Sequence, residues 1–162
     1  MTLQLTLPIF LSENHPSFSL RLTFSGISNL VLTNIYLDHD VYETYTALPQ
    51  KIETLVLPFT NYFSKLSSNI TVPHQLTCRS TFQQKVLMAL IDIPYGETIT
   101  YGELAQTVNT YPQAIGQALK SNPLPLIYPC HRVVSKKGIG GFMGQRAGKQ
   151  CDLKSLLLQL EK

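Results

Sequence analysis

A cysteine and a histidine stand side by side in the run Pro129-Cys130-His131-Arg132-Val133. A thiol with an ordinary pKa is mostly protonated at neutral pH, and it becomes a strong nucleophile only as the thiolate, which a neighbouring base or positive charge promotes. An imidazole titrates close to neutral pH and can act as that base. A Cys-His pair alone is a weak signal, so its meaning depends on the elements that position it.

The thiol of Cys130 and the imidazole of His131 are not expected to touch. Consecutive residues of an extended segment point to opposite sides. A Cys-His hydrolase needs a direct thiol–imidazole contact and an oxyanion hole, so this arrangement disfavours a hydrolase. A water molecule between the two groups would still allow the imidazole to take the thiol proton.

Two capping-box patterns predict two helices upstream of this run. Ser80 stands three residues before Gln83, and Thr100 stands three residues before Glu103, so that side chains at each helix start satisfy backbone N–H groups. The second helix is expected to end at about Val108. The inward apolar residues are Phe82, Val86, Leu87 and Leu90 in the first helix, and Leu104, Ala105 and Val108 in the second.

A third helix is predicted from Pro112 to about Ser121, after a turn at 109–111. Proline suits the first position of a helix, where its missing donor costs little. Two short helices joined by a tight turn describe a helix-turn-helix over about 101–121.

The third helix has small residues on one face and polar residues on the next. The small ones are Ala114, Ala118 and Ser121, with Gly116 close by, and the polar ones are Gln113, Gln117 and Lys120. A glycine inside a helix costs about 1 kcal/mol relative to alanine, which indicates a need for close approach. Two explanations stay open, namely tight packing on the preceding helix or a helix pressed into a DNA groove, where the polar residues reach base edges and phosphates.

The first half of the chain resembles a small α/β unit in its patterning. Apolar residues alternate over 18–24 and again over 31–37, with a break at Ser25-Gly26, which predicts two partner strands. Apolar steps of three and four residues predict a helix over 49–66, kinked or split at Pro58. The polar run 67–77 is expected to be a linker. Surface or turn positions are expected for the scattered histidines His15, His39 and His74.

The composition of the 162 residues fits one ordinary domain or two small ones, with 44% hydrophobic and 14% charged residues. No apolar run reaches the ~18–20 residues that span a bilayer, and no secretory signal is recognisable, so a cytoplasmic protein is expected, or a nuclear one in a eukaryote. Three cysteines without a repeated spacing indicate neither a disulfide framework nor a metal site. Inert thiols are expected at Cys78 and Cys151, although a disulfide between them stays open for a thermophile.

The charge is unevenly distributed. Residues 1–78 hold three Lys/Arg against five Asp/Glu, whereas residues 79–162 hold ten against five. A basic C-terminal half fits contact with phosphates, because each neutralised phosphate releases counterions. A solvated basic surface is the alternative explanation.

Several motifs occur in a fixed order along the second half. They are 81–83 (Thr-Phe-Gln), 93–98 (Ile-Pro-Tyr-Gly-Glu-Thr), 100–105 (Thr-Tyr-Gly-Glu-Leu-Ala), 122–123 (Asn-Pro) and 129–134 (Pro-Cys-His-Arg-Val-Val). In this order the chain closely resembles the O6-alkylguanine-DNA alkyltransferases from about residue 80 onward. The resemblance implies a variable α/β N-terminal domain over 1–75, with antiparallel strands plus a helix. It also implies a mostly α C-terminal domain over 76–162, with the helix-turn-helix and the active-site motif 129–133.

The resemblance implies single-turnover repair of duplex DNA, without cofactor or metal. Cys130 would take the alkyl group from guanine O6 and keep it as a thioether. Whether O4-alkylthymine is also a substrate stays open. The damaged nucleotide must be flipped out of the duplex, because a protein thiol cannot reach O6 inside the stack, and the helix-turn-helix would bind in the minor groove. No membrane contact and no obligate protein partner are expected, and a monomer is the simplest state.

Catalytic roles follow from the same resemblance. A relay through water would join Cys130, His131 and Glu161, Tyr101 would protonate the leaving guanine at N3, and Asn122 would tie the cysteine segment to the recognition helix. The Leu-rich run 156–160 favours a docked helix that holds Glu161, against the alternative of a frayed end. Contacts to the lesion or the DNA are implied for Gln113, Ala114, Gln117, Lys120, Val133, Ser135, Met143 and Arg132, the last of these chiefly as an anchor for nearby carbonyls or for the two domains.

Two residues depart from the family pattern. Gln113 stands where the family normally inserts an arginine into the gap left by the flipped base, and Phe142 stands where many relatives have a tyrosine. The first departure predicts weaker flipping of the base. Two further alternatives remain, a DNA-binding regulator without chemistry and a protein that binds alkylated DNA without repairing it. The second of these lacks a reactive cysteine, so Cys130 argues against it.

Overall fold

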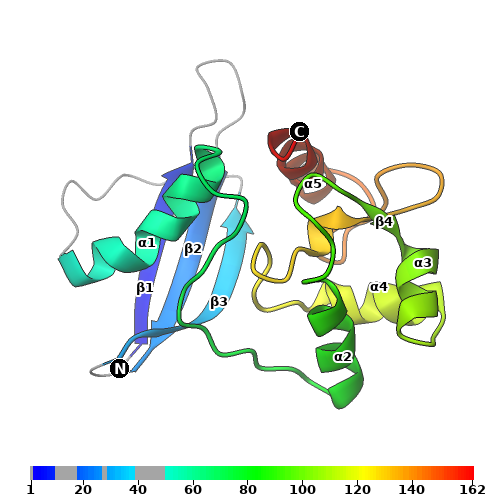
Figure 1. The fold of residues 1–162 in the computed structure, drawn as a ribbon, viewed down its shortest axis with the longest axis horizontal. Coiled ribbons are helices and arrows are strands. Elements are labelled where there is room, and N and C mark those ends of the chain that lie inside the picture. Colours follow the sequence, from blue (N-terminus) through cyan, green and yellow to red (C-terminus); the bar gives the residue numbers. More distant parts are fainter. Residues whose placement is uncertain (1, 10–17, 27–28, 39–49) are drawn as a thin grey trace. The chain divides into compact units, whose positions relative to one another are not determined.

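The computed structural model describes residues 2–9, 18–26, 29–38 and 50–162. The chain divides into two compact units, Met1–Thr77 and Cys78–Lys162. Figure 1 shows strands and a helix in the first unit and mainly helices in the second. Two of the histidines expected at surface or turn positions, His15 and His39, lie outside the described residues.

The first unit contains a three-stranded antiparallel sheet in the order β1 (Thr2–Ile9), β2 (Phe18–Ser25) and β3 (Val31–Asp38). The two strands predicted from alternation, β2 and β3, are confirmed. The sequence analysis above does not predict β1, although Leu3, Leu5, Leu7 and Ile9 alternate with polar residues and proline.

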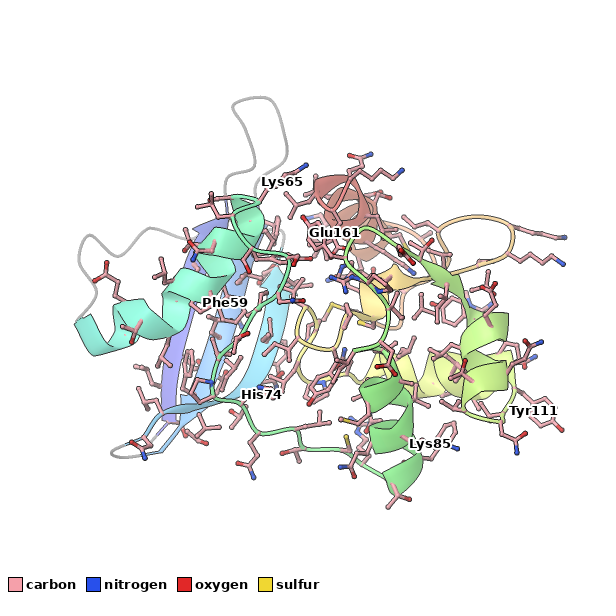
Figure 2. The ribbon with its side chains drawn as sticks, viewed as in Figure 1. Phe59, Lys65, His74, Lys85, Tyr111 and Glu161 are labelled. Carbon is pink, nitrogen blue, oxygen red and sulfur yellow. The ribbon has the colours of Figure 1, made fainter. Side chains whose placement is uncertain are left out.

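One helix, α1 (Gln50–Phe63), packs its apolar side on this sheet. Phe59, which Figure 2 labels, is fully buried. The Phe63 ring meets Phe18 of β2 edge to face with centroids 5.4 Å apart. Pro58 lies inside this single helix, so the predicted split is not observed. Proline removes one backbone hydrogen bond, but most of a helix's stability in a protein comes from packing of its apolar face.

The segment predicted to be a linker is partly attached to the sheet. The Leu32 N–H donates to the Pro73 carbonyl at 2.8 Å, and the Gln75 N–H donates to the Leu32 carbonyl at 2.9 Å. These bonds give the edge strand β3 a short parallel neighbour at Leu32 and His74. His74 itself is exposed, as predicted.

The second unit carries four helices among its described elements. They are α2 (Thr81–Ala89), α3 (Tyr101–Thr107), α4 (Pro112–Lys120) and α5 (Lys149–Leu160). A short helix η1 (Cys130–Arg132) leads into β5 (Val133–Val134), which pairs in parallel with β4 (Ile99–Thr100). Helices α2, α3 and α4 pack on one another, and α5 packs on η1.

Both predicted helix starts are confirmed. The Ser80 hydroxyl accepts the Gln83 N–H at 3.1 Å, and Thr100 with Glu103 forms a complete capping box. The prediction that Phe82 is buried is wrong, because its side chain is 37% exposed and Gln83 is buried instead. The Gln83 amide donates to the carbonyls of Ala118 and Ser121, each at 3.1 Å, and thereby joins α2 to the end of α4.

The turn between α3 and α4 is closely held. Asn109 has a φ of 57°, and the N–H groups of Asn109 and Thr110 donate to the carbonyls of Gln106 and Ala105. This is a Schellman motif, in which a left-handed residue ends a helix and satisfies its last carbonyls. The Lys85 ammonium from α2 adds a bond of 2.9 Å to the Val108 carbonyl. The predicted turn at 109–111 is therefore confirmed. Hydrogen bonds to the end of α3 and from Lys85 of α2 hold it in place.

Two sequence expectations concern the chain as a whole. Cys78, Cys130 and Cys151 are free thiols, so the alternative of a disulfide between Cys78 and Cys151 is wrong. Across residues 2–9, 18–26, 29–38 and 50–162, no helix has the length and apolar character needed to cross a membrane.

Candidate active site

Cys130 is the first residue of η1 and lies in the interior of the second unit, with 4% of its surface exposed. Its N–H donates to the Tyr128 carbonyl at 2.7 Å, and its carbonyl accepts the Val133 N–H. The segment is thus a 3₁₀ turn, and the extended conformation expected from the sequence is wrong. Successive side chains of a 3₁₀ helix still diverge, because it has three residues per turn.

The Cys130 thiol sits among opposing influences. Burial raises its pKa above the ordinary value, while the Asn122 side chain and the positive charge of Lys154 lower it. Burial is the largest of these influences. The resting group is therefore the thiol, and a base must remove its proton when it reacts.

Asn122 connects the end of α4 to the segment before the cysteine. Its amide N–H donates to the Tyr128 carbonyl at 2.8 Å, and its side-chain oxygen accepts the Leu124 N–H at 3.1 Å. The same Tyr128 carbonyl accepts the Cys130 N–H. The position of the nucleophile is therefore coupled to the position of α4.

His131 and Glu161 form a fully buried pair, with 2.9 Å between Nε2 and Oε1. The carboxylate also accepts the Gly96 N–H at 3.2 Å and three bonds from the Arg132 guanidinium between 2.9 and 3.2 Å. Glu161 ends the docked helix α5, which the Leu-rich run predicts. Gly96 allows this approach, because a Cβ there would lie 2.8 Å from the Glu161 carbonyl oxygen.

These partners determine the tautomer of His131. The ionised carboxylate of Glu161 can only accept hydrogen bonds. Nε2 of His131 therefore carries the hydrogen, and Nδ1 of the neutral ring keeps a lone pair. Burial lowers the pKa of His131, and the hydrogen bond and charge of Glu161 raise it, with burial the larger effect. Nδ1 is buried and has no hydrogen-bond partner among the described residues. A neutral imidazole thus holds a nitrogen lone pair that no group of the described residues bonds.

Arg132 extends this network within its own unit. Its guanidinium donates to the Ile93 carbonyl at 2.8 Å and lies 5.7 Å from the centre of the Tyr95 ring. The bidentate contact with Glu161 and the bond to a carbonyl agree with an anchoring residue, since a planar guanidinium suits both.

Lys154 of α5 is a site residue that the sequence analysis above does not identify. Its ammonium group is wholly buried, donates to the carbonyls of Val133 at 2.6 Å and Gly141 at 3.1 Å, and lies 5.7 Å from the centre of the Tyr101 ring. Burial lowers the pKa of Lys154 to about 8. The signal in the sequence is its spacing, because Lys154 lies three residues after the buried Cys151 and three before the buried Leu157.

Tyr101, the first residue of α3, shares the Gly141 carbonyl with Lys154. Its hydroxyl donates to that oxygen at 3.0 Å. Burial is the largest cause that raises the pKa of Tyr101, so the phenol keeps its proton. Glycine suits position 140 beside it, because the φ angle there is 74° and a Cβ would lie 3.0 Å from the ring.

A groove of about 1070 Å³ opens between α4 and the segment 135–146, with Cys130 and Tyr101 in its lining. Of the residues predicted to contact the lesion or DNA, five line it, namely Gln113, Gln117, Lys120, Ser135 and Met143. Ala114 is half-buried and Val133 is buried, and neither lines the groove. Asn122, His131, Arg132 and Glu161 also lie outside the lining.

Gly116 lines the same groove on α4. A Cβ at this position would have no heavy atom within 4 Å. The alternative of tight packing on the preceding helix is therefore wrong for Gly116. Packing instead involves the small residues beside it, because Ala118 is buried and Ser121 bonds to Gln83 of α2.

Met143 lines the groove from a tight turn with positive φ angles. The Phe142 N–H and the Gln145 N–H each donate to the other residue's carbonyl at 2.9 Å, while Met143 and Gly144 have φ values of 47° and 84°. Two positive φ angles describe a type I′ turn, which favours Asn or Gly at the position of Met143. The Met143 N–H takes no part in the turn's own pair of bonds.

Known proteins resemble the chain in sequence and in structure. Residues 81–162 match the DNA-binding domain of 6-O-methylguanine DNA methyltransferase. A methylated-DNA–protein-cysteine methyltransferase of Archaeoglobus fulgidus is 40% identical over 123 residues, which cover 74% of this chain and 82% of that protein.

Two solved structures from Mycobacterium tuberculosis are similar as well. The O6-methylguanine methyltransferase matches with a TM-score of 0.75 at 30% identity, over 99% of this chain and 93% of the other. OGT in complex with DNA matches with a TM-score of 0.67 at 33% identity, over 87% and 86%. The match in sequence thus spans the half of the chain that holds Cys130, and the chain belongs to the 6-O-methylguanine DNA methyltransferase family.

Proposed function

We propose that this chain repairs DNA directly, by moving the alkyl group of O6-alkylguanine onto Cys130 in a single, irreversible turnover. The relatives named above support the activity. The observation in this chain that carries the proposal is the geometry of His131: Nε2 is bonded to Glu161, while the buried Nδ1 has no hydrogen-bond partner among the described residues, beside a thiol that stays protonated at rest.

The proposed reaction is an in-line displacement at a saturated carbon. A water between Nδ1 of His131 and the Cys130 sulfur passes the thiol proton to the imidazole. The sulfur then bonds to the alkyl carbon while the bond between that carbon and guanine O6 breaks, and its electron pair stays on the base. Tyr101 gives its proton to N3 of the leaving guanine and regains one from the imidazolium through solvent, and exchange with solvent then moves the purine proton from N3 to N1. The net change exchanges the thiol hydrogen for the alkyl group and returns ordinary guanine.

Lesion contacts are proposed from groups that face the groove or lie next to it. The Tyr101 hydroxyl would exchange the Gly141 carbonyl for guanine N3. The carbonyls of Cys130 and Val133 already accept one bond each, and a carbonyl can accept a second from the purine amine. The Met143 N–H would reach O6.

Binding to duplex DNA is proposed for α3 and α4 as a helix-turn-helix, with α4 against a groove of the DNA and the damaged nucleotide extruded toward Cys130. The cysteine, the relay and the groove lie within Cys78–Lys162, which supports residues 76–162 as the part that binds DNA and reacts. Because one chain supplies all these groups, we further propose that it acts as a monomer.

Intact-mass measurement tests the activity. The protein is incubated with a duplex that carries one O6-methylguanine, and Cys130→Ala serves as the control. We expect one added methyl group per protein, located on Cys130 and absent from the control. Repeated turnover, or tight binding of the lesion without a change in mass, would reject the proposal, and the second result would identify a protein that binds damage without repairing it.

A further inference from the structure

Tyr111 is the most exposed large hydrophobic residue of the second unit, with 78% of its surface accessible. It is the N-cap residue of α4, and Figure 2 shows it projecting from the turn between α3 and α4. A single exposed aromatic residue is common on protein surfaces and does not by itself indicate a binding site. Two further observations point to a ligand: the backbone of Tyr111 is held in place, and its neighbours line a groove that carries exposed cations.

The backbone that carries Tyr111 is held on both sides. The Schellman motif at Asn109 and the bond from Lys85 fix the turn before it. After it, Pro112 occupies the first helical position, and the Tyr111 carbonyl accepts the N–H groups of Ala114 at 3.0 Å and Ile115 at 3.3 Å. A tyrosine has only two side-chain torsions to order, so a flat aromatic surface on this backbone can bind at a low entropic cost.

The neighbours of Tyr111 indicate a polyanion as the partner. Pro112 and Gln113, which follow it directly, line the groove that holds Cys130. Exposed cations line the same groove from α4 and from the opposite segment, namely Lys120, Lys136, Lys137 and Arg146. Phosphates satisfy such a set of charges, and the bases of the same molecule offer flat faces to an aromatic ring.

We propose that Tyr111 stacks on a DNA base beside the extruded nucleotide and keeps the duplex open while the lesion occupies the groove. The inference rests on the proposed function, because only a flipped nucleotide leaves a stack to be filled. Gln113 can hydrogen-bond to an orphaned base but has no flat apolar surface. The neighbouring tyrosine supplies that surface, so the two residues divide the task between them.

A fluorescent reporter tests the contact without depending on alkyl transfer. The chain contains no tryptophan, so Tyr111→Trp, combined with Cys130→Ser to prevent reaction, places a single tryptophan at the proposed contact, and this tryptophan is excited at a wavelength that tyrosine does not absorb. We expect its emission to be quenched when a short duplex with one O6-methylguanine binds, because stacking on bases quenches indole. The matched control is Tyr36→Trp in the same background, at a half-exposed position on β3, and its emission should stay unchanged.

The rate of methyl transfer tests whether stacking by Tyr111 assists the reaction on duplex DNA. Tyr111→Ala should slow methyl transfer from the duplex by about tenfold, and it should leave transfer from the free base O6-methylguanine unchanged, since a free base needs no opening of a duplex. Tyr111→Trp should keep the duplex rate. A melting curve of Tyr111→Ala confirms that the variant is folded.

The outcomes separate this inference from the proposed function. If the wild-type protein binds the duplex but transfers no methyl group, the proposed function fails, and the fluorescence result still decides the role of Tyr111. If the tryptophan at 111 is not quenched by bound duplex, or if Tyr111→Ala slows both substrates equally, the stacking role is overturned. An unchanged duplex rate would likewise overturn it and would leave Tyr111 available for contact with another protein.

Discussion

Lys154 carries a positive charge in the interior of the second unit, and burying that charge destabilises the folded protein. Its pKa is lowered from 10.5 to about 8 by burial. A difference of this size corresponds to roughly 3 kcal/mol of unfavourable energy for the protonated form. The ammonium group recovers part of this cost from the carbonyls of Val133 and Gly141. The charge of Lys154 lowers the pKa of the Cys130 thiol. The buried ammonium group therefore favours formation of the thiolate.

Removing the Lys154 charge should therefore weaken the nucleophile. Lys154→Met keeps the length of the side chain and is expected to raise the pKa of Cys130, because the attraction to the thiolate is lost. The pKa is measured from the pH dependence of iodoacetamide reaction at the Cys130 peptide, followed by mass spectrometry. Lys149→Met, an exposed lysine on the same helix, is the control and should leave the pKa of Cys130 unchanged.

The same residue should affect stability in alkaline solution. Because the pKa of Lys154 is lower in the folded state, the unfolded chain binds more protons between about pH 8 and pH 10.5, so stability rises with pH in that window. Below about pH 8 the full cost is present. Because burial raises the pKa of the Cys130 thiol, that group has the opposite effect on stability in the same window. The expected result is therefore a difference: relative to Lys154→Met, urea unfolding of the wild-type protein should gain about 2 kcal/mol between about pH 7.5 and about pH 9.5. Equal pH dependence in the two proteins would contradict this account.

At the scale of elements, local signals in the sequence predict local structure well. The hydroxyl of Ser80 and the box of Thr100 with Glu103 act within four residues, so their helices can be predicted without knowledge of the fold. Alternation likewise predicts β2 and β3, and the antiparallel sheet with helices agrees with the fold of the structural relatives.

Features that depend on distant partners could not be predicted in this way. Gln83 is buried in place of Phe82 because its amide reaches carbonyls 35 and 38 residues away. Lys154 enters the site through bonds to β5 and to Gly141. The open side of Gly116 and the unpaired Nδ1 of His131 are likewise properties of packing. A family resemblance points to catalytic positions, but these contacts require the assembled unit.

Gly116 on α4 offers a test in which stability and binding change in opposite directions. Gly116→Ala meets no atom within 4 Å, so it should raise the free energy of unfolding by up to about 1 kcal/mol, the difference in helix propensity. DNA affinity should fall, because the new methyl group occupies the surface proposed to approach the duplex. Chemical denaturation and fluorescence anisotropy measure the two effects. Unchanged affinity in a stabilised variant would place the DNA elsewhere.

The turn at Met143 is expected to store strain. A non-glycine residue in the left-handed region costs about 1–2 kcal/mol, and Asn tolerates that region better than Met. Met143→Asn should therefore raise the free energy of unfolding by about 1 kcal/mol. Denaturant titration measures this. A lower stability would show that the Met143 side chain contributes more by packing than its backbone costs.

For DNA binding by the whole molecule, the number of basic side chains exposed to phosphates matters more than the total number of basic residues. Residues 79–162 hold ten basic and five acidic side chains, but Arg132, Lys154 and Glu161 are buried and engaged with one another or with carbonyls. The exposed cations of the groove are Lys120, Lys136, Lys137 and Arg146. These four set an upper limit on the electrostatic part of DNA binding that the groove supplies.

The salt dependence of DNA binding should reflect this limit. Each neutralised phosphate contributes about −0.9 to the slope of log affinity against log salt, so four cations predict a slope of about −3 to −4. Lys136→Gln should reduce its magnitude by about 1. Lys65→Gln, an exposed lysine of the first unit, should leave the slope unchanged. A much steeper slope in the wild-type protein would require cations outside the groove.

The short ladder between β4 and β5 gives the reaction a mechanical consequence. It pairs Ile99 with Val133 and Thr100 with Val134. This single pair of short strands therefore joins the start of α3, at Tyr101, to the end of η1, the helix that begins at Cys130. An alkyl group fixed on the buried sulfur adds volume to a packed site, and packed interiors yield by shifting backbone. We expect this ladder to exchange its amide hydrogens faster in the alkylated protein. Alkylated protein would then open locally at this ladder more often than unmodified protein. A protease could use that difference to remove the alkylated molecules.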